Sequence, residues 1–545
     1  MKSKTLRIIP LGGLGEVGKN MTVYEYDDKI LIVDAGMMFP DNDMIGIDYI
    51  IPDFEYVKQR ANKVVGVVVT HGHEDHTGAI GHLLESVDAP VYATPLTLGL
   101  IQAKLNRRGF NKKSRLVTVH AGESVQIGPF KVDFFHVCHS VPDGVGLGIE
   151  TPAGLVVHTG DYKFDHTPVD NWPTDYAKLA EFARKGVLAL LADSTNAERP
   201  GWTPSERVID AALDKVFQQA KGRIIVATFA SLISRMQQVV DVAARYNRKV
   251  AFVGLSLTEN IRIAQELGYI KLDEKMIVSQ DVALTMPESK VVLLVTGSQG
   301  EPTSILGRLA NGTNRRFEIK AGDTVVLSSH PIPGNEELVY HAINSLMEQG
   351  AEVIYEAIAP VHVSGHASQE EMKLLLHLTR PRYLIPVHGE LRMLKQHRRL
   401  GLDVGMDEKQ IAMVENGRVI EFTHGEMKLG ERIPGGYVFV DGTGVGDVDA
   451  STMREREEIG QDGIVLLNME VDRKTGSLKD FEIISRGFMT PEESESLFTE
   501  MRRRAKKMID HNAGNMQGEI KKLAQSMIFE ETKRKPMVFT TITRN

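Results

Sequence analysis

Cysteine is almost missing from this sequence: Cys138 is the single one among 545 residues. One cysteine excludes an internal disulfide bond and a cysteine-rich zinc site. Long apolar runs are also missing, since none approaches the roughly 18 residues that suggest a membrane span. The first residues, MKSKTLRIIPLGG, lack the apolar stretch of a signal peptide. We therefore expect a cytoplasmic protein with no membrane segment.

A large net charge is missing as well. The chain has 64 Lys and Arg residues against 72 Asp and Glu residues, for a formal charge of −8. This balance lacks the basic footprint that is usual for a nucleic-acid binder, although a local positive groove is compatible with a negative total. The substrate therefore has to be inferred from the residues of the site.

The length of the chain predicts several domains, and its pattern changes along the sequence. Residues 1–205 are short strand-like runs separated by Gly, Asp and Pro turns. Over 206–359, helical patterns alternate with buried strands, which predicts a mostly parallel sheet. Short strands and histidines return over 360–448. Residues 449–545 predict a further small α/β unit, whose charged helices are more typical of a solvated face than of a nucleic-acid surface.

Residues 13–18, GLGEVG, match the dinucleotide-binding pattern G-x-G-x-x-G, and an acidic residue, Asp34, follows at a suitable distance. That pattern binds pyrophosphate only where the glycines open a helix. The residues that follow, NMTVYEYDDKILIVDAG, predict a β-hairpin instead. We therefore reject a dinucleotide site and expect a tight turn between strands.

The strongest motif is THGHEDHTG, directly after the apolar run VVGVVV. His71 and His73, two positions apart at a strand end, point to the same side and can reach one cation. Asp75 and His76 can reach a second cation beside it. Imidazole and carboxylate are ligands that zinc and manganese accept. The motif therefore predicts a metal centre.

Three further candidates share one placement. Asp34, His139 and Asp161 each come directly after a buried strand, in LIVDAG, FFHVCHS and LVVHTGD. Any one of them alone could be a capping or core residue. Together they predict one rim that is assembled from the ends of several strands.

In their order along the chain, these motifs resemble those of the metallo-β-lactamase superfamily. The resemblance implies an αββα sandwich with two metal ions, zinc or manganese, at one edge. One ion would be held by His71, His73 and His139, and the other by Asp75 and His76. Asp161 would bridge the two ions, and Asp34 would orient a ligand histidine.

Beyond Asp161 the chain resembles the members that carry an inserted β-CASP domain. The first motif, LLADSTN, supplies Asp193, and the second, HVSGHAS, supplies His366. The third, PVHGE, supplies His388, and this histidine would complete the ligands of the second metal ion. A histidine at this third motif favours RNA over DNA as the substrate. The implied fold is a metallo-β-lactamase sandwich in two parts, 1–205 and 360–448 with a linker, interrupted by a β-CASP α/β domain at 206–359. A small C-terminal α/β domain for oligomerisation would follow at 449–545.

Within that group, GGLGEVGKN, TGSQGEP, SSHPIPGNE and SGHASQEE look like ribonuclease J, and the likeness runs from about residue 6 to the end. It implies a two-metal ribonuclease of RNA maturation and decay, with endonuclease activity and 5′→3′ exonuclease activity that prefers a 5′ monophosphate. It also implies homodimers or homotetramers and partners in an RNA degradation complex. Intact metal motifs favour the active paralogue over a catalytically silent RNA-binding or scaffold subunit. A small-substrate thioesterase would not need the inserted domain.

The resemblance also assigns residue roles. Asp75 would orient the attacking water, and His366 would contact the scissile phosphate or act as general acid, the alternative being a structural histidine. A pocket for the 5′ phosphate would use Ser231, His362, Val363, Ser364, Gly365 and His366, and Gly365 would permit close backbone approach. Arg235 is a weaker candidate, because an arginine one helical turn on is more often exposed. A structural calcium ion would be bound by Ile45, Ile47 and Asp441. Trp172 and Trp202 are more typical of packing than of base stacking.

Overall fold

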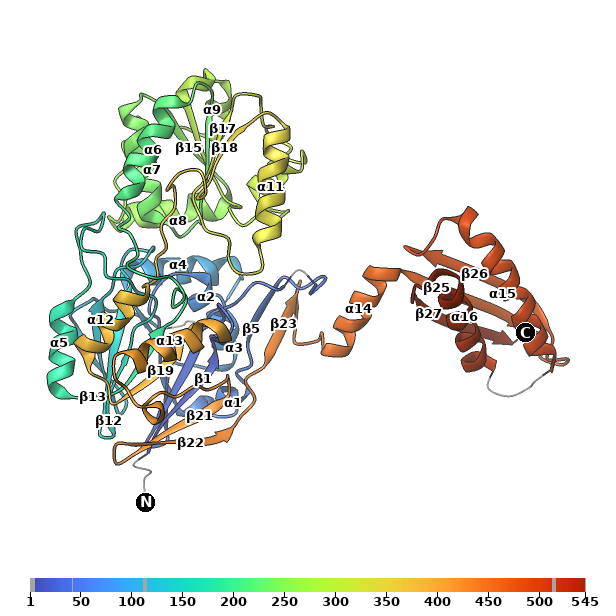
Figure 1. Cartoon of the computed structure of the whole chain (residues 1–545), viewed down its shortest axis with the longest axis horizontal. Coiled ribbons are helices and arrows are strands. Elements are labelled where there is room, and N and C mark those ends of the chain that lie inside the picture. The colour runs from blue at the N-terminus through green and yellow to red at the C-terminus, as the bar shows by residue number, and fades with distance from the viewer. Residues whose placement is uncertain (1–4, 42, 111–114, 512–515, 545) are drawn as a thin grey trace. The chain divides into compact units, whose positions relative to one another are not determined.

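The structure is a computed structural model that describes residues 5–41, 43–110, 115–511 and 516–544 (Figure 1). The chain divides into two compact units, Met1–Phe39 with Ile50–Val438 and Pro40–Tyr49 with Phe439–Asn545. Among the helices of the described ranges, none combines the length and the apolar character that crossing a bilayer requires. Each unit is described by itself below.

Two sheets make up the sandwich of the first unit. Their orders are β22-β21-β1-β3-β4-β6-β7-β8 and β19-β13-β12-β11-β10-β9. Apolar side chains of both sheets, including Tyr24, Val33, Phe134 and Leu147, form one buried cluster. The strands of the eight-stranded sheet are β1 (Leu6–Gly12), β3 (Met21–Tyr26), β4 (Lys29–Val33), β6 (Val64–Val68), β7 (Val91–Ala93), β8 (Leu116–Thr118), β21 (Arg418–Thr423) and β22 (Glu426–Arg432). Those of the six-stranded sheet are β9 (Ser124–Ile127), β10 (Phe130–His136), β11 (Val145–Thr151), β12 (Gly154–His158), β13 (Val187–Asp193) and β19 (Tyr383–Val387).

Helices cover the outer faces of the two sheets. Helices α5 (Tyr176–Lys185), α12 (Gln369–Thr379) and α13 (Leu391–Asp403) bury Phe182, Leu375 and Leu400 against the six-stranded sheet. Helix α4 (Pro95–Arg107) packs against β7 and β8, with α3 (Ile80–Ser86) beside it. The predicted αββα sandwich is confirmed. The first unit also has the short helices α1 (Glu55–Lys58) and α2 (Glu74–Thr77) and the short strands β2 (Leu14–Gly15) and β20 (Gly389–Glu390). The strands β5 (Tyr49–Pro52) and β23 (Tyr437–Asp441) include residues of both units, and β24 (Gly444–Val445) belongs to the second.

The inserted domain has a parallel five-stranded sheet of order β15-β16-β14-β17-β18. Its strands are β14 (Ile224–Ala227), β15 (Lys249–Val253), β16 (Val291–Val295), β17 (Thr324–Leu327) and β18 (Glu352–Ile354). One face packs on α6 (Val208–Gln219), α7 (Ile233–Arg245) and α8 (Leu255–Glu266), the other on α9 (Gln280–Thr285), α10 (Ile305–Ala310) and α11 (Glu336–Glu348). The chain leaves the six-stranded sheet after β13 and re-enters it at the parallel neighbour β19, so the insertion leaves the sheet unbroken.

The GLGEVG segment forms no helix. It includes β2 and leads into the antiparallel pair β3 and β4, which is joined by a turn at Asp27 and Asp28, both with positive φ. Gly12 lies so close to Lys19 that an added Cβ would meet its carbonyl oxygen at 1.8 Å. Gly13, Gly15 and Gly18 of the segment itself all have positive φ, so the glycines serve a tight turn, as predicted.

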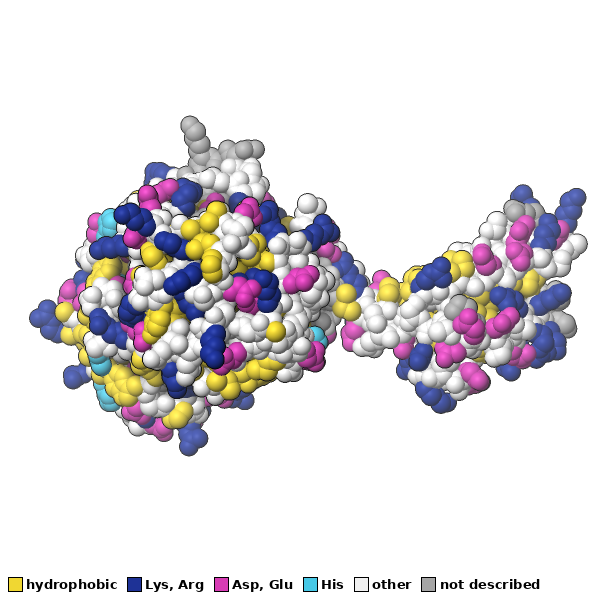
Figure 2. Space-filling view, turned by 90° about the horizontal axis from the view of Figure 1, so that it is seen from above, with side chains coloured by type: hydrophobic (Ala, Val, Ile, Leu, Met, Phe, Trp, Pro, Cys, Tyr) yellow, Lys and Arg dark blue, Asp and Glu magenta, His cyan; other side chains and the backbone are white. Residues whose placement is uncertain are grey.

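The second unit contains α14 (Ala450–Asp462) and a three-stranded sheet of order β26-β25-β27, with β25 (Ile464–Val471), β26 (Leu478–Arg486) and β27 (Met537–Arg544). Helices α15 (Pro491–His511) and α16 (Met516–Thr532) cover one face of this sheet and bury Leu467, Met501 and Ile528. Figure 2 shows basic and acidic side chains intermixed on this unit. On α15, for example, Arg503 and Arg504 both pair with Glu500. This mixture agrees with a solvated face.

Candidate metal centre

The predicted metal residues meet at one edge of the sandwich, where β6, β10, β12 and β19 end. Their ligand atoms fall into two groups, each with all atoms within 4.8 Å of one another. The first group is His71, His73, His139 and Asp161, and the second is Asp75, His76, Asp161 and His388. Residues from four separate strand ends thus converge, because the carboxyl ends of neighbouring strands lie at one edge.

The first group is built around His73. Its Nδ1 atom lies 3.1 Å from Nε2 of His71 and 3.1 Å from Nε2 of His139. Burial lowers the pKa of His73 to about 4 and holds the pKa values of His71 and His139 well below the usual range. The three imidazoles are therefore neutral at pH 7, and their lone pairs can bind a cation.

Asp161 faces both groups. Its Oδ2 atom faces the first group and lies 3.6 Å from Nε2 of His71 and 3.7 Å from Nε2 of His139. Its Oδ1 atom faces the second group. This oxygen lies 3.2 Å from Nε2 of His76 and accepts a hydrogen bond from Nδ1 of His388 at 2.7 Å. Oδ2 of Asp161 and Nε2 of His388 are buried with no hydrogen-bond partner. Buried polar atoms without partners are costly, and a divalent cation between the groups would satisfy both. The residues present therefore fit a pair of divalent metal ions.

The second group combines two carboxylates with two imidazoles. Asp75 Oδ2 lies 3.5 Å from Nε2 of His76 and 3.3 Å from Nε2 of His388. Burial opposes protonation of both histidines, but the negative charges of Asp161 and Asp75 outweigh it. The pKa of His76 is therefore raised well above its usual value, and the pKa of His388 is raised to about 10. This group therefore attracts positive charge, which a proton or a metal ion can supply.

Asp34 holds a ligand histidine in place. It accepts hydrogen bonds from Nδ1 of His76 at 2.7 Å and from the backbone N–H of Thr70 at 2.8 Å. The first bond places the His76 proton on Nδ1 and leaves Nε2 facing the second group. Asp34 and His388 both have positive φ, at 61° and 52°, a strained backbone state that is enriched at functional sites. Thr70 precedes the motif directly, and sequence reasoning missed it.

His366 is paired with Asp193. Its Nδ1 donates to Oδ2 of Asp193 at 2.7 Å, and Asp193 also accepts from the backbone N–H and hydroxyl of Thr195. Burial opposes protonation of His366, but Asp193 and Asp161 raise its pKa. The His366 ring lies 5.0 Å from that of His139. Asp161, Asp193, His366 and His388 form a third group that could hold a metal ion. His366 therefore sits beside the metal centre with a fixed tautomer.

The segment 362–366 is attached to the metal centre. Nδ1 of His139 donates to the Gly365 carbonyl at 2.8 Å, which fixes the tautomer of that histidine. An added Cβ at Gly365 would lie 2.6 Å from the His139 ring, so the close approach that this glycine permits is to His139. Asn196, another residue that sequence reasoning missed, donates to the Ser364 hydroxyl at 2.8 Å and to the His366 carbonyl at 3.0 Å.

The two other pocket candidates lie in or against the inserted domain. Val363 is buried in the apolar cluster of the inserted domain, and Ser231 lies in the turn between β14 and α7. The expectation that Arg235 is exposed is wrong: only 1% of it is accessible, because Glu206 and the Val361 carbonyl bind its guanidinium. It cannot contact a substrate directly.

The residues assigned to calcium bind an arginine in the second unit. Arg456 donates to the Ile45 carbonyl at 3.1 Å and to Oδ2 of Asp441 at 2.6 Å. A calcium ion would have to share these oxygens with a guanidinium of the same charge sign, which repels it. Ile47 contributes a buried side chain and a backbone N–H bond to Met44. The structure places a guanidinium on two of the predicted oxygens, and the calcium assignment stays a prediction.

The two tryptophans lie near the insertion. Trp172 stacks on His136 with ring centres 3.9 Å apart and is 42% exposed. Trp202 is 48% exposed, and its ring centre lies 5.7 Å from that of His166. Trp172 thus has a packing contact, as expected, although both rings remain partly accessible.

Family models match four parts of the chain. Residues 14–196 match the metallo-beta-lactamase superfamily, and 350–411 match the Zn-dependent metallo-hydrolase RNA specificity domain. Residues 221–346 match the ribonuclease J beta-CASP domain, and 451–545 match the ribonuclease J C-terminal domain. Fold, site and family models together define a metal-dependent hydrolase of the metallo-β-lactamase fold with a β-CASP insertion.

Known ribonucleases J are similar to this chain over most or all of its length. The chain is 41% identical over 548 residues to ribonuclease J2 of Bacillus subtilis, covering 99% of each chain. It is 45% identical to ribonuclease J of Synechocystis, over 89% of this chain and 76% of that one, and 42% identical to ribonuclease J of Thermus thermophilus, over 92% and 87%. A crystal structure of an Enterococcus faecalis protein of unknown function shares the fold, with a TM-score of 0.55 and 15% identity over 78% of this chain and all of that one.

This chain belongs to the ribonuclease J family. It is a metal-dependent ribonuclease, and its substrate is RNA. A catalytically silent scaffold is not favoured, and neither is a small-substrate thioesterase, because both metal groups are intact and the relatives are ribonucleases by name.

Proposed function

We propose that this ribonuclease degrades RNA from its 5′ end with a preference for a 5′ monophosphate, and that it also cuts RNA internally during maturation and decay in the cytoplasm. The observation that carries the proposal is the hydrogen bond between His139 and Gly365. It joins the metal centre to the segment that would bind the terminal phosphate. A terminal phosphate held at that segment would set the first phosphodiester bond at a fixed distance from the metals.

Two divalent cations would be held by His71, His73, His139 and Asp161 and by Asp75, His76, Asp161 and His388. When bound, they would lower the pKa of a water molecule and neutralise charge on the phosphoryl oxygens. Zinc and manganese both accept these ligands. Asp75 would orient the attacking water. His366, oriented by Asp193, would contact the scissile phosphate and donate a proton to the leaving oxygen.

The phosphate pocket would use Ser231, His362 and Ser364. The Ser364 hydroxyl accepts hydrogen bonds from Asn196 at 2.8 Å and from the His366 N–H at 3.2 Å, so its own proton is free to be donated. Nδ1 of His362 is buried with no partner. Burial lowers the pKa of His362 well below its usual value, and the positive charge of Arg235 lowers this pKa further. Positive surroundings and an unused donor both suit a phosphate.

Ser364→Ala should slow 5′→3′ decay of 5′-monophosphate RNA and change internal cleavage far less. Loss of one hydrogen bond to a charged group costs about 1.5–3 kcal/mol, or roughly ten- to a hundredfold in rate. The rates are measured on 5′-labelled RNA and on a long RNA with a blocked end. Ser279→Ala, which removes a hydroxyl that caps α9 in the inserted domain, is the control. Equal losses on both substrates would mean that Ser364 serves the general RNA path.

We further propose that the C-terminal unit assembles the enzyme into dimers or tetramers. Leu466, Ile484 and Phe539 are paired in register on the sheet face opposite the helices. Phe539 is 47% exposed, and burying this apolar row would stabilise a unit of a size that is marginal alone. Partners in an RNA degradation complex would also bind the assembled enzyme.

Truncation after about residue 450 should convert the oligomer to a monomer in sedimentation and weaken activity, because the associating face is lost. In the full chain, Phe539→Ser should shift the same equilibrium. Phe529→Ser removes a ring of similar exposure from α16 and should leave it unchanged. If the truncated chain sediments as the same oligomer, the assembly lies elsewhere.

A further inference from the structure

Arg235 is a fully buried arginine at the start of α7. The Nε atom of Arg235 donates to the Gln238 side chain at 3.0 Å, and its Nη2 donates to Glu206 at 2.6 Å. Its Nη1 donates both to the Ser328 hydroxyl and, at 2.9 Å, to the Val361 carbonyl. With 1% of its surface accessible, its charge serves contacts inside the protein. Besides Gln238 on the same helix, these contacts reach three other segments of the chain, at Glu206, Ser328 and Val361.

One side of this network holds the phosphate-binding segment. The Val361 carbonyl accepts hydrogen bonds from both Arg235 and the Ser328 hydroxyl, the latter at 2.7 Å. Val361 directly precedes His362 in the chain. Two donors on one carbonyl fix the backbone at the point where the segment begins.

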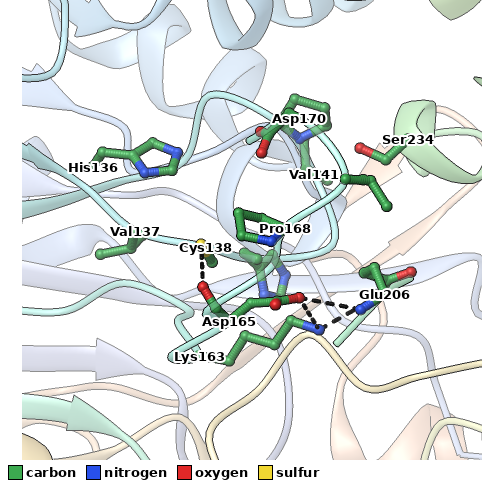
Figure 3. A pocket seen from close by; sticks show the side chains of 13 residues that line it. His136, Val137, Cys138, Val141, Lys163, Asp165, Pro168, Asp170, Glu206 and Ser234 are labelled. Carbon is green, nitrogen blue, oxygen red and sulfur yellow. Dashed lines mark hydrogen bonds and ion pairs between the residues drawn. The ribbon is translucent and has the colours of Figure 1, made fainter. Parts of the chain in front are cut away.

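The other side of the network reaches the metal centre. The Glu206 carboxylate accepts a hydrogen bond from Arg235, and its Oε1 atom lies 3.9 Å from Nζ of Lys163. The backbone N–H of Glu206 donates to the Asp165 carboxylate at 3.1 Å. The Lys163 N–H donates to the Cys138 carbonyl at 2.8 Å. Figure 3 shows the Lys163, Asp165 and Glu206 side chains meeting, with Cys138 and Ser234 around the same pocket. Cys138 precedes His139, and Lys163 lies two residues beyond Asp161.

We propose that Arg235 is a positioning residue that fixes the distance between the 5′-phosphate segment and the metal centre, and so determines the preference for a 5′ monophosphate. The inference rests on the proposed function. Arg235 connects the segment to loops that carry two metal residues. A guanidinium does this because its planar fork donates in several fixed directions, which an ammonium cannot reproduce.

Arg235→Lys tests the inference in the full-length, metal-loaded enzyme. The lysine keeps the charge opposite Glu206 but loses the fork. The ratio of kcat/KM for 5′-monophosphate RNA to that for 5′-hydroxyl RNA should fall about tenfold, the effect of one charge-assisted hydrogen bond, mainly through KM. Bound metal and internal cleavage should change little.

Arg223→Lys is the matched control. Arg223 is a buried arginine of the same domain that binds Asp323 at 3.0 Å, and it lies before β14, at the other end of the sheet from Ser328. This variant should lower the unfolding temperature without changing the substrate ratio. If it lowers the ratio as far as Arg235→Lys does, general loss of stability explains both, and the inference is wrong.

A second variant separates folding from positioning. Arg235→Met leaves the buried Glu206 carboxylate without its 2.6 Å partner and with only the more distant Lys163, 3.9 Å away. Arg235→Met with Glu206→Gln removes both charges of the close pair. Compared with Arg235→Met alone, the double variant should have a higher unfolding temperature but an equally low ratio of activity on 5′-monophosphate RNA to activity on 5′-hydroxyl RNA. If the unfolding temperature and this ratio both recover, the inference is overturned. A wild-type enzyme without a 5′-monophosphate preference would refute the proposed function itself. A wild-type preference that Arg235→Lys retains would refute only the role of Arg235.

Discussion

His73→Ala should abolish RNA cleavage while the protein stays folded. Nδ1 of His73 lies between Nε2 of His71 and Nε2 of His139, so its loss removes one of three imidazoles from the first group. Stabilisation of transition-state charge by a metal ion is worth several kcal/mol, which corresponds to about a thousandfold or more in rate. The side chain is only partly buried, so the fold should tolerate its removal.

The test measures turnover, bound metal and thermal unfolding on the same preparation. His82→Ala is the matched control, because His82 is a buried histidine of the same domain that contacts Arg108 outside the metal groups. It should keep two metals and nearly full activity. Unchanged activity of His73→Ala with two metals still bound would contradict the assignment of this group.

Much of the fold and of the metal groups could be predicted because the evidence is local. His71, His73, Asp75 and His76 lie within six residues, directly after a buried strand. The hairpin after GLGEVG follows from two apolar runs around an Asp-Asp turn. Order along the chain, together with the family resemblance, then predicted the more distant partners at the other strand ends.

The rest could not be predicted, because it depends on pairs that are far apart in sequence. Arg235 is buried by the Val361 carbonyl, 126 residues away, and helical position alone favours exposure. Arg456 reaches the Ile45 carbonyl across 411 residues, a contact that no local pattern predicts. Local sequence does not show which side chain lies closest to such an oxygen.

His366→Ala should lower kcat by a hundred- to ten-thousandfold, roughly the contribution of a general acid, while both metal ions stay bound. The structure offers two roles for this residue. Its Nδ1 donates to Asp193, which leaves Nε2 available to a leaving oxygen. It also belongs to the group with Asp161, Asp193 and His388, which could hold an ion by itself.

Metal content distinguishes these roles. A general acid can be lost without loss of metal, and Asp193→Asn should then reduce kcat as well, because it disturbs the tautomer of His366 and leaves the first metal group intact. His330→Ala, which removes a histidine paired with Glu356 on the surface, is the control and should be active. If His366→Ala loses one metal in proportion to its activity, His366 is a ligand, and the proton for the leaving oxygen must come from another group.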